Sequence, residues 1–214
     1  MCGRYENASS NEELQEIFSK YAGTLDIAYD IEDILKEQNI APTNFVKVIV
    51  LEDNVFKLKV MKWGIRSKIF DPSRLPKGLD PNIEKDIFNS KIETLSKSAR
   101  WKKFFSSSRC LFPMTAFYEW IPGDGKKIPQ RINLKKENIF FSAGIYTPND
   151  IKGEVSASII TCEPNKFMKV VHNRMPAIIT PKDADRFLAD EDAARQICEP
   201  LDDSIIMEIE KANI

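Results

Sequence analysis

Hydrophobic and polar positions along this chain recur with two periods, one typical of helices and one typical of strands. Residues 9–23 show the helical period. The apolar positions of one helical face are Leu14, Ile17, Phe18 and Tyr21. The sequence Ser9-Ser10-Asn11-Glu12 offers a capping box at the start of this stretch, and Gly23 is placed to end it. The pattern predicts a first helix over residues 9–23.

Most of the middle of the chain is typical of short strands separated by turns. Strands are expected at Phe45–Glu52, Val55–Met61, Arg109–Ile121, 128–134, 138–145 and 155–162. The first two are predicted to form a hairpin across Asp53-Asn54. The third is followed by Pro122-Gly123-Asp124-Gly125, a strong turn signal.

Helical patterns are expected at three further places, namely Ile92–Phe105, residues 164–171 and an acidic, mostly helical tail over residues 181–214. The stretch Asp71–Lys85 contains three prolines and has no periodicity, which predicts a surface loop. No repeat or long linker divides the chain. We therefore expect one α+β domain over residues 1–214.

Composition places the chain among soluble proteins, since 43% of its residues are hydrophobic and 29% are charged. No apolar run approaches the roughly 20 residues that span a bilayer. No signal peptide follows Met1, so the expected location is the cytoplasm, with no membrane association. Four well-separated cysteines and a single histidine supply too few ligands for an ordinary zinc site. Neither a metal nor another cofactor is expected.

Charge is unevenly distributed, although the net charge is only −1. Residues 6–53 contain 11 acidic and 3 basic side chains, and residues 183–214 contain 10 and 3. Between Lys57 and Arg109 there are instead 14 basic and 5 acidic side chains, a balance of +9. This segregation favours a basic face that attracts phosphates. The alternative is that these cations are scattered over a solvated surface.

Cys2 is a candidate nucleophile, because removal of Met1 before a small side chain would leave cysteine at the N-terminus. Its α-amine would have an ordinary pKa of about 7.7–8.0 and its thiol one of about 8.5. The amine can attack an aldehyde to give an imine, and the thiol can then close a five-membered thiazolidine. A cysteine at this position is most often incidental, so the motif alone is weak.

Two other side chains are candidates for acid–base chemistry. Glu119 is the lone charge in the run from Leu111 to Pro122, and its aromatic neighbours would desolvate it and raise its pKa. The alternative for Glu119 is an outward-facing strand residue. His172, the sole histidine, is followed by Arg174 and Pro176 in a polar stretch between apolar segments. A lone histidine is more often a surface or packed residue than a catalyst.

Six short motifs, taken together and in order, resemble the SRAP family, whose members are SOS response-associated peptidases and abasic-site processing proteins. The motifs are Met1-Cys2-Gly3-Arg4-Tyr5, Ala41-Pro42-Thr43, Met61-Lys62-Trp63-Gly64, Asn89-Ser90-Lys91-Ile92-Glu93-Thr94, Arg109-Cys110-Leu111 through Phe117-Tyr118-Glu119-Trp120, and His172-Asn173-Arg174-Met175-Pro176. They run from residue 2 to about residue 180. The resemblance implies mostly antiparallel sheets curled into a barrel-like core with flanking helices.

The resemblance also implies a chemistry, in which Cys2 crosslinks to the ring-opened sugar of an abasic site in single-stranded DNA. Asn89 would hold the opened sugar or the Cys2 backbone, and Glu119 would shuttle protons. His172 would bind a sugar hydroxyl or a phosphate and assist reversal of the crosslink. Strand cleavage of the lyase type would be a competing outcome. We expect such a protein to act as a monomer, associated with the nucleoid when it is bound to DNA.

DNA contacts are implied for four further residues. Arg4 and Arg174 would contact phosphates beside the lesion, and Trp63 would either pack beneath the site or stack on a base. Lys91 stands where the family usually has arginine, so its grip on phosphate is expected to be weaker without the bidentate fork. Residues 65–70 replace a Pro-Trp element that is common in the family, which leaves the stacking of bases unassigned.

Two other functions remain as alternatives. Cys2, Glu119 and His172 could serve a cysteine-dependent peptidase as nucleophile, orienting group and base. Because no leader precedes Met1, little self-processing would remain to be done. A non-covalent reader of modified DNA bases is the third possibility, and it predicts binding that tolerates Cys2→Ala.

Overall fold

The computed structural model describes residues 2–28, 37–68 and 84–214. The predicted surface loop at Asp71–Lys85 lies outside the described residues except for its last two positions, and Phe70 lies outside them as well. In the described part of the chain, no helix is long and apolar enough to cross a membrane.

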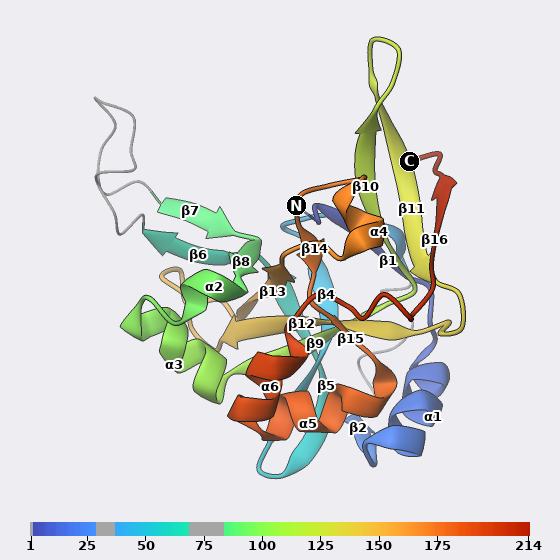
Figure 1. The fold of residues 1–214 in the computed structure, drawn as a ribbon. Helices are drawn as coiled ribbons and strands as arrows, with labels where there is room; N and C mark the ends of the chain where they lie inside the picture. Colours follow the sequence, from blue (N-terminus) through green and yellow to red (C-terminus); the bar gives the residue numbers. More distant parts are fainter. Residues whose placement is uncertain (1, 29–36, 69–83) are drawn as a thin grey trace, which may run out of the picture.

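Two sheets dominate the molecule (Figure 1). The smaller has five strands in the order β16 (Met207–Lys211), β11 (Lys127–Leu134), β10 (Ala116–Pro122), β1 (Arg4–Asn7) and β3 (Glu37–Ile40). All of its neighbours are antiparallel. The pairing of β1 with β10 brings the start of the described chain to the centre of the molecule, beside the β10–β11 hairpin.

The larger sheet has nine strands and curls on itself. Its main path is β14 (Met175–Pro176), β13 (Ser156–Cys162), β12 (Phe140–Thr147), β9 (Arg109–Met114), β4 (Phe45–Glu52), β5 (Val55–Trp63) and β2 (Leu25–Ile27). Two short strands, β15 (Ile178–Ile179) and β8 (Asn89–Lys91), add to β12 and β13. A parallel pairing of β13 with β5 closes five of these strands into a ring.

Helices cover the outside of the curled sheet (Figure 1). They are α1 (Asn11–Tyr21), α2 (Ile92–Leu95), α3 (Ala99–Ser107), α4 (Lys166–Lys169), the 3-10 helix η3 (Pro181–Asp183), α5 (Ala184–Ala189) and α6 (Glu191–Ile197). A separate pair of strands, β6 (Ile65–Lys68) and β7 (Glu84–Ile87), projects as an arm beside α2 and α3. The predicted α+β class with curled, mostly antiparallel sheets is confirmed.

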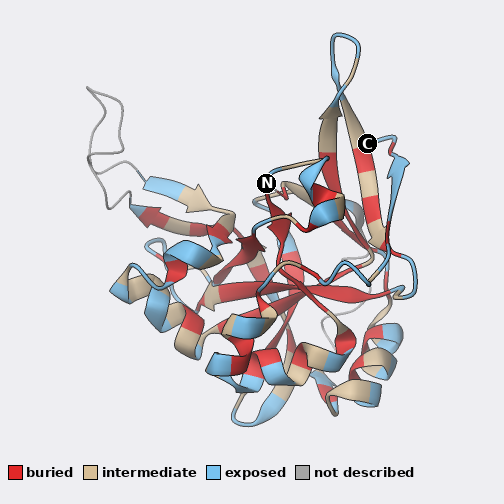
Figure 2. Ribbon diagram, in the orientation of Figure 1, coloured by how far each residue is buried: buried red, intermediate tan, exposed pale blue. Residues whose placement is uncertain are grey.

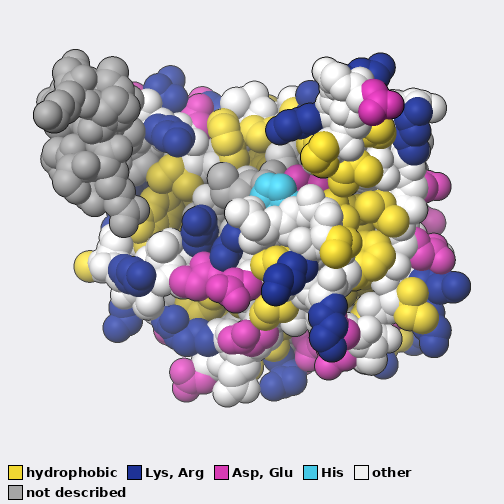
Figure 3. Space-filling model, turned by 45° about the horizontal axis from the view of Figure 1, so that its top comes forward, with side chains coloured by type: hydrophobic (Ala, Val, Ile, Leu, Met, Phe, Trp, Pro, Cys, Tyr) yellow, Lys and Arg dark blue, Asp and Glu magenta, His cyan; other side chains and the backbone are white. Residues whose placement is uncertain are grey.

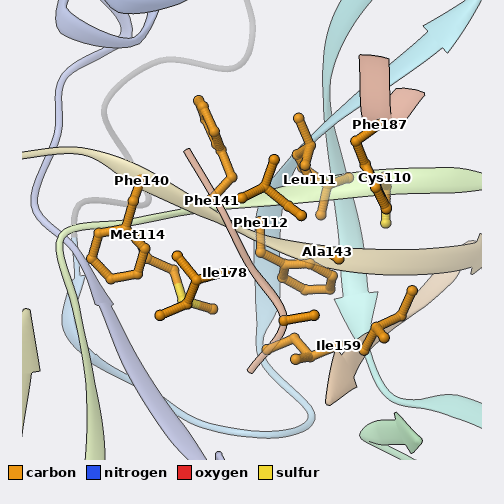
Figure 4. Packing of buried hydrophobic residues seen from close by; sticks show 14 of the residues in the cluster. Cys110, Leu111, Phe112, Met114, Phe140, Phe141, Ala143, Ile159, Ile178 and Phe187 are labelled. Atoms are coloured by element: carbon orange, nitrogen blue, oxygen red, sulfur yellow. The ribbon is translucent and has the colours of Figure 1, made fainter. Parts of the chain in front are cut away.

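Buried hydrophobic side chains pack together in the core (Figure 4), and several strands of the ring are buried on both faces (Figure 2). Every residue of β9 and β13 is buried, which explains why β9 is apolar from Cys110 to Met114 rather than alternating. Phe112 packs so closely on the backbone of Gly144 that a β-carbon at position 144 would clash with its ring. A glycine is therefore needed at this position of β12, where it pairs with β9.

Several predicted elements have the expected form. Ser10 is the N-cap of α1, and its capping box is completed by Glu13. The β4–β5 hairpin turns at Asp53 and Asn54, both with positive φ of 53° and 59°. These are the left-handed conformations that a tight two-residue hairpin turn requires.

Three predictions were wrong in detail. The helix expected at Ile92–Phe105 is divided into α2 and α3, with Ser98 as the N-cap of the second. The strand expected at Arg109–Ile121 is two strands in different sheets, separated at Thr115. The tail is not helical to its end, because β16 alternates in sequence and pairs with β11. Helical periodicity cannot detect a strand whose partner lies so far away in sequence.

Candidate functional site

Cys2 lies immediately before β1, at the junction of the two sheets. In the register of β1 and β10, Arg4 pairs with Tyr118, which places Cys2 near the end of β10 that carries Glu119. The Cys2 side chain is fully buried, and its sulfur lies 3.6 Å from the carbonyl oxygen of Arg4. Burial raises the pKa of the Cys2 thiol, and the negative charge of Glu119 raises it further. The thiol is therefore neutral at physiological pH.

Asn89 holds the main chain of Cys2 from the opposite sheet. Its strand, β8, runs parallel to β13, with Asn89 opposite Ile159. The Asn89 Nδ2 group donates a hydrogen bond of 2.9 Å to the carbonyl oxygen of Cys2. Its Oδ1 atom is buried and has no hydrogen-bond partner among the described residues. Asn89 thus holds the main chain of Cys2, and its side-chain oxygen remains available as an acceptor beside it.

Glu119 and His172 approach each other next to Cys2. The Nδ1 atom of His172 lies 3.9 Å from a carboxylate oxygen of Glu119, whose side chain is 4% exposed. Burial raises the pKa of Glu119, and the nearby charge of His172 opposes this shift. The Nδ1 atom of His172 also lies 3.0 Å from the backbone nitrogen of Arg174 and 3.1 Å from its carbonyl oxygen, so the main chain of Arg174 orients the imidazole. The result is a buried carboxyl group with an oriented imidazole beside it.

Arg174 belongs to the scaffold of the site. Its guanidinium donates to both carboxylate oxygens of Glu93, at 2.7 and 3.0 Å, and to the carbonyl oxygen of Thr161 at 2.6 Å. The residue is only 9% exposed. These bonds fasten the segment that carries His172 to α2 and β13. In this structure its guanidinium is turned inward and bound by these partners, and contact of Arg174 with a phosphate stays a prediction.

The other three predicted DNA-contacting residues lie in different settings. Trp63 is fully buried, donates from its indole nitrogen to the carbonyl oxygen of Phe88 and packs edge-on against Tyr5. It has no exposed surface with which to stack on a base, so of its two predicted roles only packing beneath the site is possible. Arg4 is partly exposed and donates to Oδ1 of Asn39 at 2.6 Å. Lys91 is exposed at the start of α2.

Figure 3 looks onto this face of the molecule. The sole histidine lies in a hollow of the surface, with apolar side chains on either side of it. A carboxylate is visible beside it, and lysine or arginine side chains surround the hollow at a greater distance. The arrangement suits a partner with an uncharged centre and anionic flanks.

Sequence reasoning missed Glu93 and Asn39 as parts of the site. Both act through arginines, as the partners of Arg174 and Arg4. Glu93 lies within a motif that the sequence had singled out, but a charge partner 81 positions away has no local signal. Within the described residues, no cluster of three or more histidine, cysteine, aspartate or glutamate side chains is placed to hold a metal ion.

Comparison with known proteins agrees with this architecture. A family model described as SOS response associated peptidase (SRAP) matches residues 1–212. The abasic site processing protein YoqW of Bacillus subtilis is 31% identical over 210 residues, which cover 94% of this chain and 88% of YoqW. The abasic site processing protein YobE of the same organism is 30% identical over 192 residues, covering 88% of this chain and 82% of YobE.

A crystal structure of a protein from Bacteroides thetaiotaomicron has the same fold. It superposes with a TM-score of 0.75 at 21% identity and covers 99% of this chain and 92% of its own. At this level of identity the likeness concerns the fold alone. The family match over nearly the whole chain establishes the relationship: this protein belongs to the SOS response associated peptidase (SRAP) family.

Proposed function

We propose that this protein processes abasic sites in single-stranded DNA by capturing their sugar aldehyde covalently on Cys2, once Met1 has been removed. The observation that carries the proposal is the proximity of Cys2 to Asn89 and Glu119, with His172 next to Glu119. The printed names of YoqW and YobE as abasic site processing proteins support it.

The chemistry balances with groups that the site contains. The α-amine of Cys2 attacks C1′ of the ring-opened sugar, and loss of water gives an imine. The thiol then adds to the same carbon, its proton passes to the nitrogen, and a thiazolidine closes. Because this second attack is intramolecular, it has a high effective concentration and does not need a pre-formed thiolate. The raised pKa of the Cys2 thiol is therefore compatible with the reaction.

Glu119 is placed to move the protons in these steps. A carboxyl group with a raised pKa retains a protonated population, which can donate to the departing oxygen. The ionised form can then accept a proton from the attacking amine. His172 would bind a sugar hydroxyl or a phosphate, and Asn89 Oδ1 would accept from a sugar hydroxyl. Arg4 and Lys91 would contact the flanking phosphates.

The same geometry is less suited to a cysteine peptidase. A peptidase needs a thiolate nucleophile, and such enzymes lower the pKa of their cysteine with a neighbouring cation. Here burial and Glu119 raise the pKa of the Cys2 thiol instead. Acyl transfer by Cys2 would begin from an unfavourable protonation state, whereas aldehyde capture begins at the amine.

The decisive experiment is a denaturing gel. The untagged protein, with its N-terminus verified by mass spectrometry, is incubated with single-stranded DNA in which a uracil has been excised. The expected result is a DNA band shifted by the mass of the protein and resistant to SDS. Failure to form this adduct with a correctly processed N-terminus would exclude covalent capture.

Two substitutions identify the reacting groups. Cys2→Ala keeps an α-amine and removes the thiol, so the stable adduct should disappear while borohydride still traps an imine. Cys198→Ala removes a different buried thiol and should leave the adduct intact. SDS-sensitive binding that survives Cys2→Ala would instead indicate a non-covalent reader. An N-terminal tag should abolish the adduct, because it places the amine in a peptide bond.

A further inference from the structure

Most of the basic side chains on the strands between Lys57 and Arg66 are neutralised by acidic neighbours. Lys59 contacts Glu52 at 2.6 Å, and Lys57 lies 3.8 Å from the same carboxylate. Lys62 pairs with Glu154 at 2.7 Å. Arg66 pairs with Glu84 and Asp86. Although the sequence places these cations in its most basic segment, they contribute little net field at the surface.

Two arginines later in the segment have structural roles. Arg109 is 8% exposed and donates to the carbonyl oxygens of Phe105, Phe187 and Leu188. Arg100 lies 5.5 Å above the ring of Phe104, in a geometry typical of a cation–π contact. Neither guanidinium is directed outward as a surface cation.

Lys97, Lys102 and Lys103 differ from all of these. The three lysines are exposed, on the turn before α3 and on the outer face of α3, while Phe105 is buried on the inner face of the helix. None of the ion pairs formed by the described residues involves any of the three. They therefore form an uncompensated cationic surface, named here the α3 lysine surface.

Few acidic residues flank the α3 lysine surface along the chain. Glu191 of α6 reaches the far end of α3, where it contacts Ser106 and pairs with Arg195. In the sequence from residue 87 to residue 118, Glu93 is the single acidic residue. Its carboxylate is bound by both terminal nitrogens of Arg174, the residue whose backbone positions His172. The ion pair cancels the charge of Glu93 and joins α2 to the site. The three exposed lysines are therefore left without a neutralising ion pair among the described residues.

The α3 lysine surface is continuous with the candidate site along the chain. Asn89, which holds Cys2, and Lys91, which begins α2, belong to the same short strand β8. The turn at Lys97 and then α3 follow directly, beside the β6–β7 arm (Figure 1). A polyanion that leaves Cys2 past Lys91 and α2 would reach the three lysines on α3 and the turn before it.

We propose that the α3 lysine surface binds the phosphodiester backbone of the DNA that continues beyond the lesion, outside the nucleotides held in the hollow. The proposal rests on the proposed function for the position of the lesion. The contact is electrostatic and independent of base sequence. The contact increases the affinity for DNA and the residence time on it, and it leaves the rate of the chemical step at Cys2 unchanged.

The test asks whether reversing the charge of the three lysines weakens binding of long DNA more than binding of short DNA. The triple variant Lys97→Glu/Lys102→Glu/Lys103→Glu and the wild-type protein are titrated with DNA that carries a tetrahydrofuran abasic analogue, which has no aldehyde. One DNA has two nucleotides on either side of the analogue and another has fifteen. Further DNAs carry a duplex on one side or the other, which separates single-stranded from double-stranded backbone as the ligand.

The triple variant should bind the long DNA at least tenfold more weakly at low salt and the short DNA as tightly as the wild type. For single-stranded DNA, loss of three phosphate contacts should reduce the slope of log affinity against log salt by about 2. Equal weakening for both lengths would overturn the proposal, since it would place the effect in the hollow. Unchanged binding of the long DNA would also overturn it.

A matched control removes the effect of total charge. Lys20, Lys136 and Lys182 are exposed on the side of α1 and η3, away from α3. Their simultaneous change to glutamate gives the same net charge and should leave the length dependence intact. Crosslinking of the short uracil-excised DNA by the wild type tests the proposed function separately. A normal adduct with no length effect rejects only the α3 lysine surface, and a length effect without an adduct rejects only covalent capture.

Discussion

Glu119 is a carboxyl group buried in the middle of β10, beside His172. Burial raises the pKa of Glu119, and nearby positive charge partly opposes this shift. A residue balanced in this way changes protonation readily when a substrate alters the hollow. The same balance means that the ionised carboxylate weakens the fold at neutral pH.

Glu119→Gln should therefore slow adduct formation and stabilise the protein. Loss of proton transfer is expected to reduce the crosslinking rate about 10²- to 10⁴-fold. Because the pKa is raised in the folded state, the wild-type carboxyl is harmless below its ordinary value of 4.5 and unfavourable when ionised above it. The variant should gain stability over the wild type as pH rises from 4 to 7, measured by urea denaturation. A difference that does not vary with pH would contradict this account.

Residue identity alone could predict part of the site. Cys2, Glu119 and His172 carry reactive groups that can be recognised from the sequence. The structure brings all three together. The inward direction of Arg174 could not be predicted, because Glu93 and Thr161 become its neighbours only after β13 and α2 have packed. The burial of Trp63 depends in the same way on Tyr5 and Phe88.

Among the elements, β1 is secured by one buried carboxylate. Glu6 accepts hydrogen bonds from Thr115, Tyr118 and Arg131, which lie on or beside β10 and β11. Burial alone would raise the pKa of Glu6, but these hydrogen bonds and the charge of Arg131 outweigh it and lower the pKa. The strand that begins two residues after Cys2 is thereby locked in register with the strand that carries Glu119.

Glu6→Gln should destabilise the protein in a pH-dependent way. Charge-assisted hydrogen bonds are worth about 1.5–3 kcal/mol, so a loss of that order in unfolding free energy is expected at pH 7. Because the folded-state pKa is lowered, the wild-type advantage exists above the ordinary value of 4.5 and is lost as pH falls through the folded value. Urea denaturation at pH 7 and at successively lower pH measures it. An advantage that grows on acidification would refute the assignment.

The sequence predicts the type of a helix or strand better than it predicts which other strand that element pairs with. The α1 capping box and the β4–β5 hairpin are local, so their residues specify them directly. The pairing of β8 with β13 joins residue 89 to residue 159, and no local pattern reveals such a contact. Because Asn89 lies on β8, the geometry of the site depends on long-range strand pairing, which is the hardest feature of the fold to predict from sequence.

In the whole molecule, the chain's last strand protects an edge of the smaller sheet. β16 pairs with β11 along five residues, and Glu210 adds an ion pair to Arg131. Met207, the first residue of β16, is buried. Without β16, the unpaired backbone groups of β11 would be exposed to other chains.

Truncation after Ile206 should therefore lower the melting temperature and promote aggregation. A loss of a few kcal/mol corresponds to a fall of about 5–10 °C for a domain of this size. Differential scanning fluorimetry and light scattering measure the two effects. A shorter truncation that ends at Ala212 leaves β16 complete and serves as the control. Equal melting temperatures for the two truncated proteins would show that β16 adds nothing to stability.

The hydrogen bond from Asn89 to Cys2 engages a carbonyl oxygen, and that choice has a practical consequence. Because this hydrogen bond engages the main chain of residue 2, it does not depend on which heteroatom the side chain of residue 2 carries. Semisynthesis could therefore install selenocysteine or 2,3-diaminopropionic acid at position 2 without loosening its attachment to β8. The same fold would then hold other aldehyde-reactive side chains at position 2, each able to react with the same sugar carbon.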